Sequence, residues 1–147
     1  MTQVRLQGIT RQFDSTTAIQ DITFQVPDRA FWVLVGPSGC GKSTVGRCLL
    51  RLHEPTSGEV LFEGENIVGI DHNRMQLLRR EMQIIFQDPY ASLNPRNTVR
   101  SIVAEPLKIH KIGNKSEQND RVSELLSSVG LDPNYADRYP HEFSGGQ

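Results

Sequence analysis

The sequence predicts an α/β fold, with strands dominating up to about residue 87 and helices following it. Apolar residues alternate at period two near the N-terminus, which is typical of half-buried strands. A glycine-rich turn then joins a continuous apolar run to a segment of helical periodicity. After residue 87 the pattern is helical. We therefore expect two subdomains, at 1–87 and 88–147, the second of them helical.

Length, composition and charge exclude several classes of protein. The 147 residues, 37% of them hydrophobic, suffice for one domain with its own core. A net charge of −1 argues against a nucleic-acid partner bound through a basic excess. The longest apolar run, Ala30–Val35, is far shorter than the roughly 20 residues that span a bilayer. Met1–Thr10 lacks an apolar signal core, and Cys40 and Cys48 fit reduced thiols, so we expect a soluble cytosolic protein.

The N-terminal part of the chain predicts three strands. Val4, Leu6 and Ile9 indicate the first strand, and Ile22–Val26 alternates at period two. Asp14–Thr17 is expected as the turn of a hairpin between them. Phe31–Val35 is apolar without alternation, as expected of a strand buried on both faces. A helix should begin at Lys42 and end at the Pro- and Gly-containing segment 55–58, and its apolar positions are Val45, Cys48, Leu49 and Leu52.

The rest of the chain predicts shorter elements and then helices. Glu59–Phe62 is expected as a strand, Asn73–Arg80 as a short polar helix and Met82–Phe86 as a buried strand. Farther on, Ser116 should cap a helix that Gly130 stops, and the face of that helix is formed by Val122, Leu125, Leu126 and Val129.

The strongest chemical signal is the phosphate-binding pattern Gly36-x4-Gly41-Lys42-Ser43, which stands between the apolar run and the predicted helix. Glycines let such a loop turn tightly and bring backbone N–H groups against phosphate oxygens, and the helix N-terminus adds positive potential. Lys42 would reach the β- and γ-phosphates, and the Ser43 hydroxyl would bind Mg²⁺. The alternative is a glycine-rich turn that binds nothing, and the agreement of strand, spacing, lysine and serine argues against it.

Three further signals are weak by themselves. Gln87 follows the predicted strand Met82–Phe86, and a glutamine at a strand end is usually solvent-facing. Phe143–Gln147 contains a Ser-Gly-Gly run, which is usually loop, although its N–H and O–H groups can donate to a phosphate. Phe13, taken alone, is most simply a core or turn phenylalanine.

Together these motifs resemble those of the nucleotide-binding subunits of ATP-binding cassette (ABC) transporters, and the resemblance covers the whole chain. Gln87 corresponds to the family's Q-loop glutamine, and Phe143–Gln147 to its signature sequence, with phenylalanine where leucine is usual. Phe13 lies where the family keeps an aromatic residue that stacks on adenine. The family's phosphate-binding loop corresponds to residues Gly36, Pro37, Ser38, Gly39, Cys40, Gly41, Lys42, Ser43 and Thr44.

The resemblance implies an ABC-type P-loop NTPase fold, in which an N-terminal β subdomain and P-loop core precede a helical subdomain that docks on membrane subunits. It implies ATP and Mg²⁺ as cofactors, Lys42 and Gln87 as catalytic residues, and Ser43 and Gln87 as metal-binding residues. The implied partners are a second nucleotide-binding subunit, identical or different, and transmembrane permease subunits at the inner face of the cell membrane. Nucleotide would also contact the signature residues Ser144, Gly145, Gly146 and Gln147.

The subfamily resemblance differs along the chain. Gly46–Leu52, Ile85–Arg96 and Tyr139–Phe143 resemble the oligopeptide, dipeptide and nickel importer ATPases, whereas Val4–Val35 resembles the carbohydrate importer ATPases. A join between two parent sequences within Gly39–Thr44 and ordinary divergence both account for this difference. Because the helical segment contacts the transporter partners in the family, the resemblance favours the uptake of peptides, with nickel or sugar as alternatives.

In the family, catalysis also needs an apolar strand ending in Asp-Glu and a switch histidine, both after the signature sequence. Ile84–Asp88 fits the Q-loop better than such a strand, and Val60–Glu63 precedes Gly64 and is expected at a sheet end. The sequence up to Gln147 thus predicts weak or absent ATP turnover by this chain alone. The histidines are expected to be solvated, namely His53, His72, His110 and His141.

Three other functions stay open as alternatives: a nucleotide-binding fragment without hydrolysis or transport, a small-molecule kinase, and an ABC ATPase that acts on ribosomes. Phosphoryl transfer to an acceptor other than water would identify the kinase. Co-purification with ribosomes rather than with membrane subunits would identify the third alternative.

Overall fold

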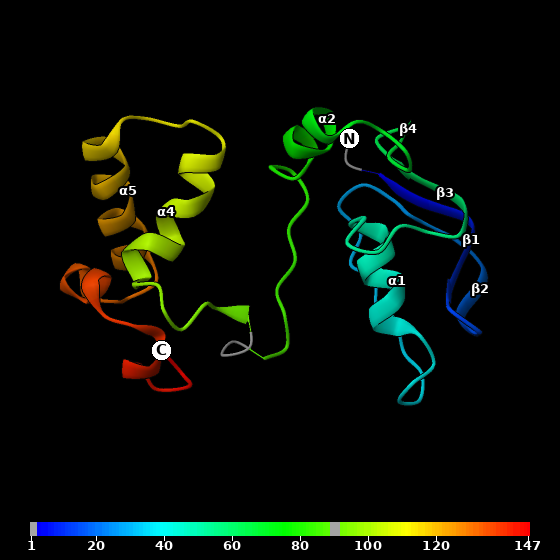
Figure 1. Cartoon of the computed structure of the whole chain (residues 1–147), viewed down its shortest axis with the longest axis horizontal. Coiled ribbons are helices and arrows are strands. Elements are labelled where there is room, and N and C mark those ends of the chain that lie inside the picture. Colours follow the sequence, from blue (N-terminus) through cyan, green and yellow to red (C-terminus); the bar gives the residue numbers. More distant parts are fainter. Residues whose placement is uncertain (1–2, 89–91) are drawn as a thin grey trace. The chain divides into compact units, whose positions relative to one another are not determined.

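The chain divides into two compact units, Met1–Ile84 and Ile85–Gln147, and the computed structural model describes residues 3–88 and 92–147. Figure 1 shows a sheet with helix α1 in the first unit and helices α4 and α5 in the second. Each unit has an apolar core of its own and is described by itself. The subdomain boundary that the sequence places after Gln87 stays a prediction.

Four strands form one antiparallel sheet in the described part of the first unit, in the order β2–β1–β3–β4 (Figure 1). The strands are β1 (Val4–Phe13), β2 (Thr16–Val26), β3 (Ser57–Phe62) and β4 (Glu65–Asn66). The strands expected at 4–9, 22–26 and 59–62 are confirmed. The hairpin turn is shorter than predicted, because Thr16 already pairs with Phe13 across the hairpin.

Helix α1 (Lys42–Leu49) packs its apolar face against the core of the sheet unit. Its buried residues are Val45 and Cys48, as the helical spacing predicts, and burial raises the pKa of the Cys48 thiol. Helix α2 (His72–Leu78) confirms the short helix expected nearby and is capped by Asp71. The remaining buried residues of this core are Leu6, Ile9, Ile19, Val60, Phe62, Ile67, Met75, Leu78 and Met82.

The predicted end of the first helix is wrong. Helix α1 ends at Leu49, well before the Pro- and Gly-containing segment, and Leu52 is 43% exposed. The physical reason is a left-handed residue after the cap, Arg51 at φ 51°. Its N–H donates to the Cys48 carbonyl at 2.9 Å, and the Leu52 N–H donates to the Arg47 carbonyl at 2.7 Å. This is the Schellman pattern, which closes a helix.

Two segments expected as buried strands, 31–35 and 82–86, are irregular in the structure. Apart from Met82 their side chains are exposed, Phe31 to 92% and Ile85 to 97%. An apolar run indicates that a segment is buried, but it does not indicate which strand lies beside it. A strand forms only where a neighbouring strand completes its hydrogen-bond ladder. Within residues 3–88 and 92–147 neither segment has such a neighbour, so both predictions are wrong for the described structure.

The second unit is helical, as expected. Its helices include α4 (Val99–Ile109), α5 (Lys115–Ser128) and two 3₁₀ helices at Pro133–Asp137 and Pro140–Glu142. Arg100 donates from Nε to Asp137 Oδ1 at 2.8 Å, which ties α4 to the first 3₁₀ helix and holds the pKa of Asp137 below its usual range. The buried residues of this unit's core are Ala104, Val122, Leu126 and Ala136.

Helix α5 departs from its prediction at its N-terminus and at one residue of its apolar face. Its N-cap is Asn114, whose side chain accepts from the Ser116 and Glu117 N–H groups in a capping box, so Ser116 is not the cap. Gly130, at φ 79°, follows the end of the helix as predicted. Val129 is 70% exposed because it is the C-cap and no longer follows the helical face.

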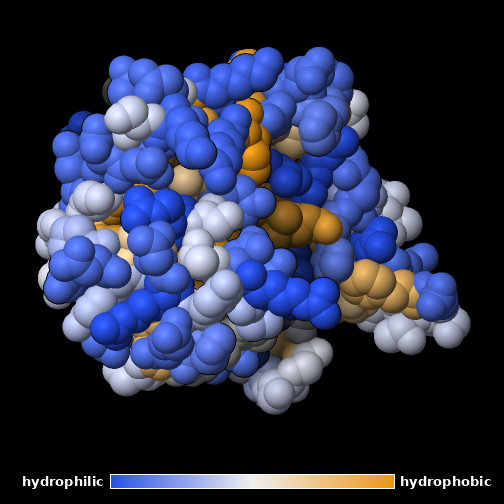
Figure 2. All heavy atoms as spheres, turned by 60° about the vertical axis from the view of Figure 1, so that its left-hand side comes forward, coloured by the Kyte–Doolittle hydropathy of each residue, from blue (hydrophilic) through white to orange (hydrophobic). Residues whose placement is uncertain are grey.

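The surface mixes hydrophilic and hydrophobic side chains. Figure 2 shows one face on which hydrophilic residues dominate and hydrophobic ones emerge between them. None of the helices that the structure describes has the length and apolar character needed to cross a membrane. Large hydrophobic side chains more than half exposed include Phe31, Trp32, Val33, Val35, Leu77, Ile85 and Val129.

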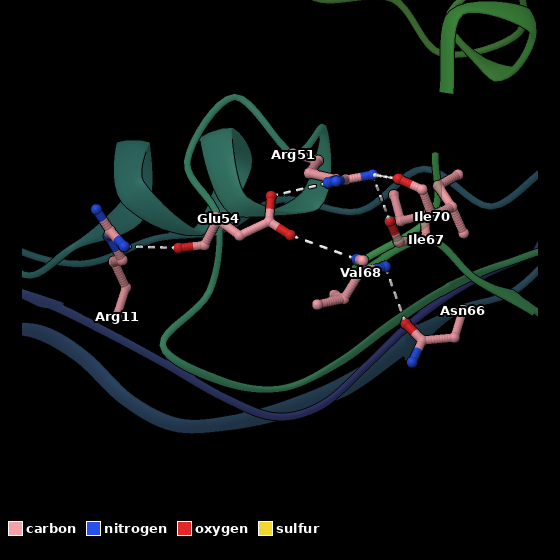
Figure 3. A network of polar contacts seen from close by, with 8 residues as sticks. Arg11, Arg51, Glu54, Asn66, Ile67, Val68 and Ile70 are labelled. Carbon is pink, nitrogen blue, oxygen red and sulfur yellow. Dashed lines mark hydrogen bonds and ion pairs between the residues drawn. The ribbon is translucent and has the colours of Figure 1, made fainter. Parts of the chain in front are cut away.

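A network of polar contacts fixes the segment after α1 (Figure 3). The Arg51 guanidinium donates through Nε to Glu54 Oε2 at 2.8 Å. Through Nη1 it donates to the carbonyls of Ile67 at 3.2 Å and Ile70 at 2.7 Å. Arg51 thus satisfies main-chain acceptors in the loop between β4 and α2.

Replacing Arg51 by alanine should lower the free energy of unfolding of the first unit by about 1–3 kcal/mol, because the Ile67 and Ile70 carbonyls lose their donor. Urea unfolding followed through Trp32, the only tryptophan, measures the change. Arg74→Ala is the matched control, because it also removes an ion pair but at a side chain 47% exposed, against 19% for Arg51. Equal shifts of the two midpoints would contradict this role of Arg51.

Candidate nucleotide-binding site

The phosphate-binding pattern forms a loop that leads directly into helix α1. Gly41 is the N-cap at φ 94° and Gly39 has φ 81°, both in the left-handed region that favours glycine. Gly41 also lies against β2: a Cβ at this position would be 2.5 Å from Ile19 Cγ2 and 2.7 Å from the Ala18 carbonyl oxygen. The loop is therefore held against the sheet at a position that only glycine fits.

The first turn of α1 supplies backbone donors next to this glycine. The N–H groups of Lys42, Ser43 and Thr44 lie in the first turn of the helix, where N–H groups have no acceptor within the helix itself. Gly41 has no side chain that could cap them. The positive end of the helix dipole lies at the same place, so this turn can bind phosphate oxygens.

Lys42 places its ammonium group against the same loop. Nζ donates to the carbonyl oxygens of Gly36 at 2.7 Å and Pro37 at 2.6 Å, and it lies 3.5 Å from Cys40 Sγ. These partners, in the described part of the chain, are neutral. The positive charge of Lys42 is therefore available to an anion bound at the loop.

Ser43, the residue expected to bind Mg²⁺, is exposed at the start of α1. Together with Lys42 it lines a hollow of about 680 Å³. Mg²⁺ prefers hard oxygen ligands and usually keeps waters and phosphate oxygens in its coordination shell, so one protein hydroxyl beside a phosphate site suits it. The Ser43 hydroxyl thus fits Mg²⁺ beside a phosphate bound at the loop. Apolar side chains complete the lining, among them Val4, Phe24, Val26, Phe31, Trp32 and Leu34.

Phe13 ends β1 beside the hairpin turn, and 36% of its surface is exposed, so it is not a core residue. The Arg11 guanidinium lies over its ring, with Cζ 4.5 Å from the centroid. The His53 ring meets it at 82°, with the centroids 5.3 Å apart. His53 is half-buried, so its ring is only in part the solvated side chain that the sequence predicts.

Gln87 and the turn Ser144–Gln147 belong to the second unit. Gln87 is exposed. In the turn, Oε1 of Gln147 accepts from the Ser144 N–H at 3.0 Å and from the Ser144 hydroxyl at 3.1 Å. Two donors of one serine therefore converge on a single oxygen, as they would on an oxygen of phosphate. The turn borders an apolar hollow of about 470 Å³ in the same unit.

The structure thus brings residues 36–44 together in the first unit and Ser144–Gln147 together in the second. Sequence reasoning missed Arg11 and Glu54 beside Phe13. Residues two apart on a strand share a face, and this spacing is the signal that could have found Arg11. Glu54 offers its main-chain carbonyl to Arg11 Nη1 at 2.7 Å, a contact that no side-chain pattern encodes.

The loop, its glycines and the helix that follows define a P-loop NTPase. The family model for the ABC transporter matches residues 19–147, so the chain belongs to the ABC transporter family. Among solved structures, the dimeric structure of MJ0796, a bacterial ABC transporter cassette, is 27% identical with a TM-score of 0.80. A second structure of MJ0796, in a post-hydrolysis state bound to ADP and Pi, is 28% identical with a TM-score of 0.78. Each match covers 98% of this chain and 64% of the other.

Similar curated proteins include ATP-binding proteins named for oligopeptide transport and for glutathione import. OppF of Bacillus subtilis (strain 168), an oligopeptide transport ATP-binding protein, is 57% identical over 133 residues, which are 88% of this chain and 43% of OppF. AppF of the same strain, named likewise, is 46% identical over 138 residues, 93% of this chain and 42% of AppF. The glutathione import ATP-binding protein GsiA of Pectobacterium atrosepticum is 49% identical over 142 residues, 97% of this chain and 22% of GsiA. The chain thus spans less than half the length of these relatives.

Gly41→Ala should destabilise the first unit more than Gly39→Ala. Left-handed strain costs each variant about 1–2 kcal/mol. A Cβ at Gly39 meets nothing within 4 Å, whereas a Cβ at Gly41 meets Ile19 and Ala18 of β2. The melting temperatures of the two variants measure the difference, and equal values would show that β2 does not hold the loop at Gly41.

Proposed function

We propose that this chain is part of the ATP-binding subunit of an importer that takes up oligopeptides, with ATP and Mg²⁺ bound at Gly36–Thr44. The phosphate loop carries the proposal, because it combines left-handed glycines, the N-terminal turn of α1 and the Lys42 ammonium within one short segment. The transport part is supported by OppF and AppF, which are named oligopeptide transport ATP-binding proteins.

Each residue has a defined role in this proposal. Lys42 and the first-turn N–H groups of α1 bind the phosphates, and the Ser43 hydroxyl holds Mg²⁺. Phe13 offers its exposed ring to the adenine. Bound ATP supplies the phosphoryl group whose transfer to water drives transport. Lys42 is the residue of the first unit that stabilises the charge developing on that group.

A second nucleotide-binding subunit completes the site in this proposal, and the dimeric structure of MJ0796 supports it. The N–H and hydroxyl of Ser144 already converge on one oxygen, so they suit a phosphate bound on the partner. Gly145 and Gly146 let the backbone approach closely. Permease subunits at the inner face of the membrane are the proposed transport partners of the helical unit.

Lys42→Ala should weaken Mg²⁺-ATP binding at least tenfold, because hydrogen bonds from a charged donor contribute roughly 1.5–3 kcal/mol. Titration calorimetry on the intact protein measures the affinity. Lys108→Ala removes an exposed lysine at the end of α4 and should leave the affinity unchanged. Unchanged binding in Lys42→Ala would contradict the site.

The substrate class is tested by uptake. In cells of the source organism that carry the Lys42→Ala variant in place of the wild-type protein, uptake of a labelled oligopeptide should stop. Uptake of labelled carbohydrate and of nickel should continue. Loss of carbohydrate uptake with peptide uptake intact would overturn the peptide assignment.

A further inference from the structure

Arg11 is held from two sides. Its Nη1 donates to the Glu54 carbonyl at 2.7 Å, and its guanidinium lies over the Phe13 ring with Cζ 4.5 Å from the centroid. Figure 3 shows the contact with Glu54, whose carboxylate in turn accepts from Arg51. Arg11 and Phe13 are two residues apart on β1, so both side chains lie on one face of the strand.

Packing of the Arg11 guanidinium against the Phe13 ring leaves one of its N–H groups without an acceptor in the described part of the chain, which costs free energy. Arg11 Nε is buried and has no hydrogen-bond partner among the residues that the structure describes. A buried N–H without an acceptor is unfavourable, and the attraction between a cation and an aromatic face offsets such a cost. Phe13 therefore carries a cation over its ring while 36% of its surface stays exposed.

The segment that holds Arg11 is the one that follows the helix of the phosphate loop. Beside the Glu54 contact, the Thr56 N–H donates to the Thr10 carbonyl at 2.8 Å, and the Gln12 N–H donates to Thr56 Oγ1 at 3.0 Å. These bonds fasten the end of β1, where the exposed ring lies, to the segment that follows α1. The position of the ring is thus tied to the element that carries the phosphate donors.

We propose that Arg11 is a positioning residue for the nucleobase, acting through the Phe13 ring. It fixes the ring from one face, and a cation there makes the ring less electron-rich, which favours stacking of an electron-rich purine on its exposed part. This inference rests on the proposed function, because it requires a nucleotide whose phosphates are bound at the loop.

The test compares two ligands on the intact protein: ATP, which has a base, and inorganic tripolyphosphate, which has none. Arg11→Ala should weaken ATP binding roughly three- to tenfold and leave tripolyphosphate binding unchanged. Arg5→Ala, an exposed arginine on the same strand, is the matched control and should change neither affinity. Equal losses for both ligands would reduce Arg11 to a structural role, and unchanged ATP binding would also overturn the proposal.

Two further variants separate the possible failures. In a Phe13→Ala background, Arg11→Ala should cause no further loss of ATP affinity, whereas additive losses would show that Arg11 does not act through Phe13. Lys42→Ala should weaken both ligands. If Lys42→Ala changes the affinity for neither ATP nor tripolyphosphate, the proposed function is wrong. If Lys42→Ala weakens the binding of both ligands while Arg11→Ala weakens the binding of neither, only the proposed role of Arg11 is wrong.

Discussion

The close approach of Gly41 to strand β2 is the constraint on which the arrangement of the first unit depends. At this point the main chain passes so near Ala18 and Ile19 that no side chain fits, and the left-handed backbone then turns into α1. The buried residues Val45 and Cys48 fix the helix on the core from the other end. The sheet, through these contacts, determines where the phosphate donors lie.

The proposed donors are already directed at oxygen atoms. The Lys42 ammonium is bonded to two main-chain carbonyls, and both donors of Ser144 meet the amide oxygen of Gln147. Each of these acceptors is neutral, so an anionic phosphate oxygen offers a stronger partner for the same donor. Donors that need little reorganisation are the ones that stabilise developing charge most effectively.

Local sequence patterns predict the elements whose partners are near in the chain, such as the β1–β2 hairpin, the phosphate loop and the buried face of α1. They fail where the deciding partner is distant or unspecified. The apolar runs at 31–35 and 82–86 indicate buried segments, but they do not indicate which strand would lie beside each of them. Helix α1 ends at a left-handed residue that is usually glycine but is Arg51 here. The N-cap of α5 is Asn114, although Ser116 is also a residue type that caps helices. The surroundings of Phe13 depend on a main-chain carbonyl, which a sequence pattern does not encode.

Binding of the phosphates of ATP at Gly36–Thr44 can be tested by the backbone amide NMR spectrum of the intact protein, recorded with and without Mg²⁺-ATP. We expect the largest chemical-shift changes at the amides of Gly39, Gly41, Lys42 and Ser43, because their N–H groups would gain phosphate acceptors. Changes confined to residues outside Gly36–Thr44 would contradict it, whatever the affinity for ATP.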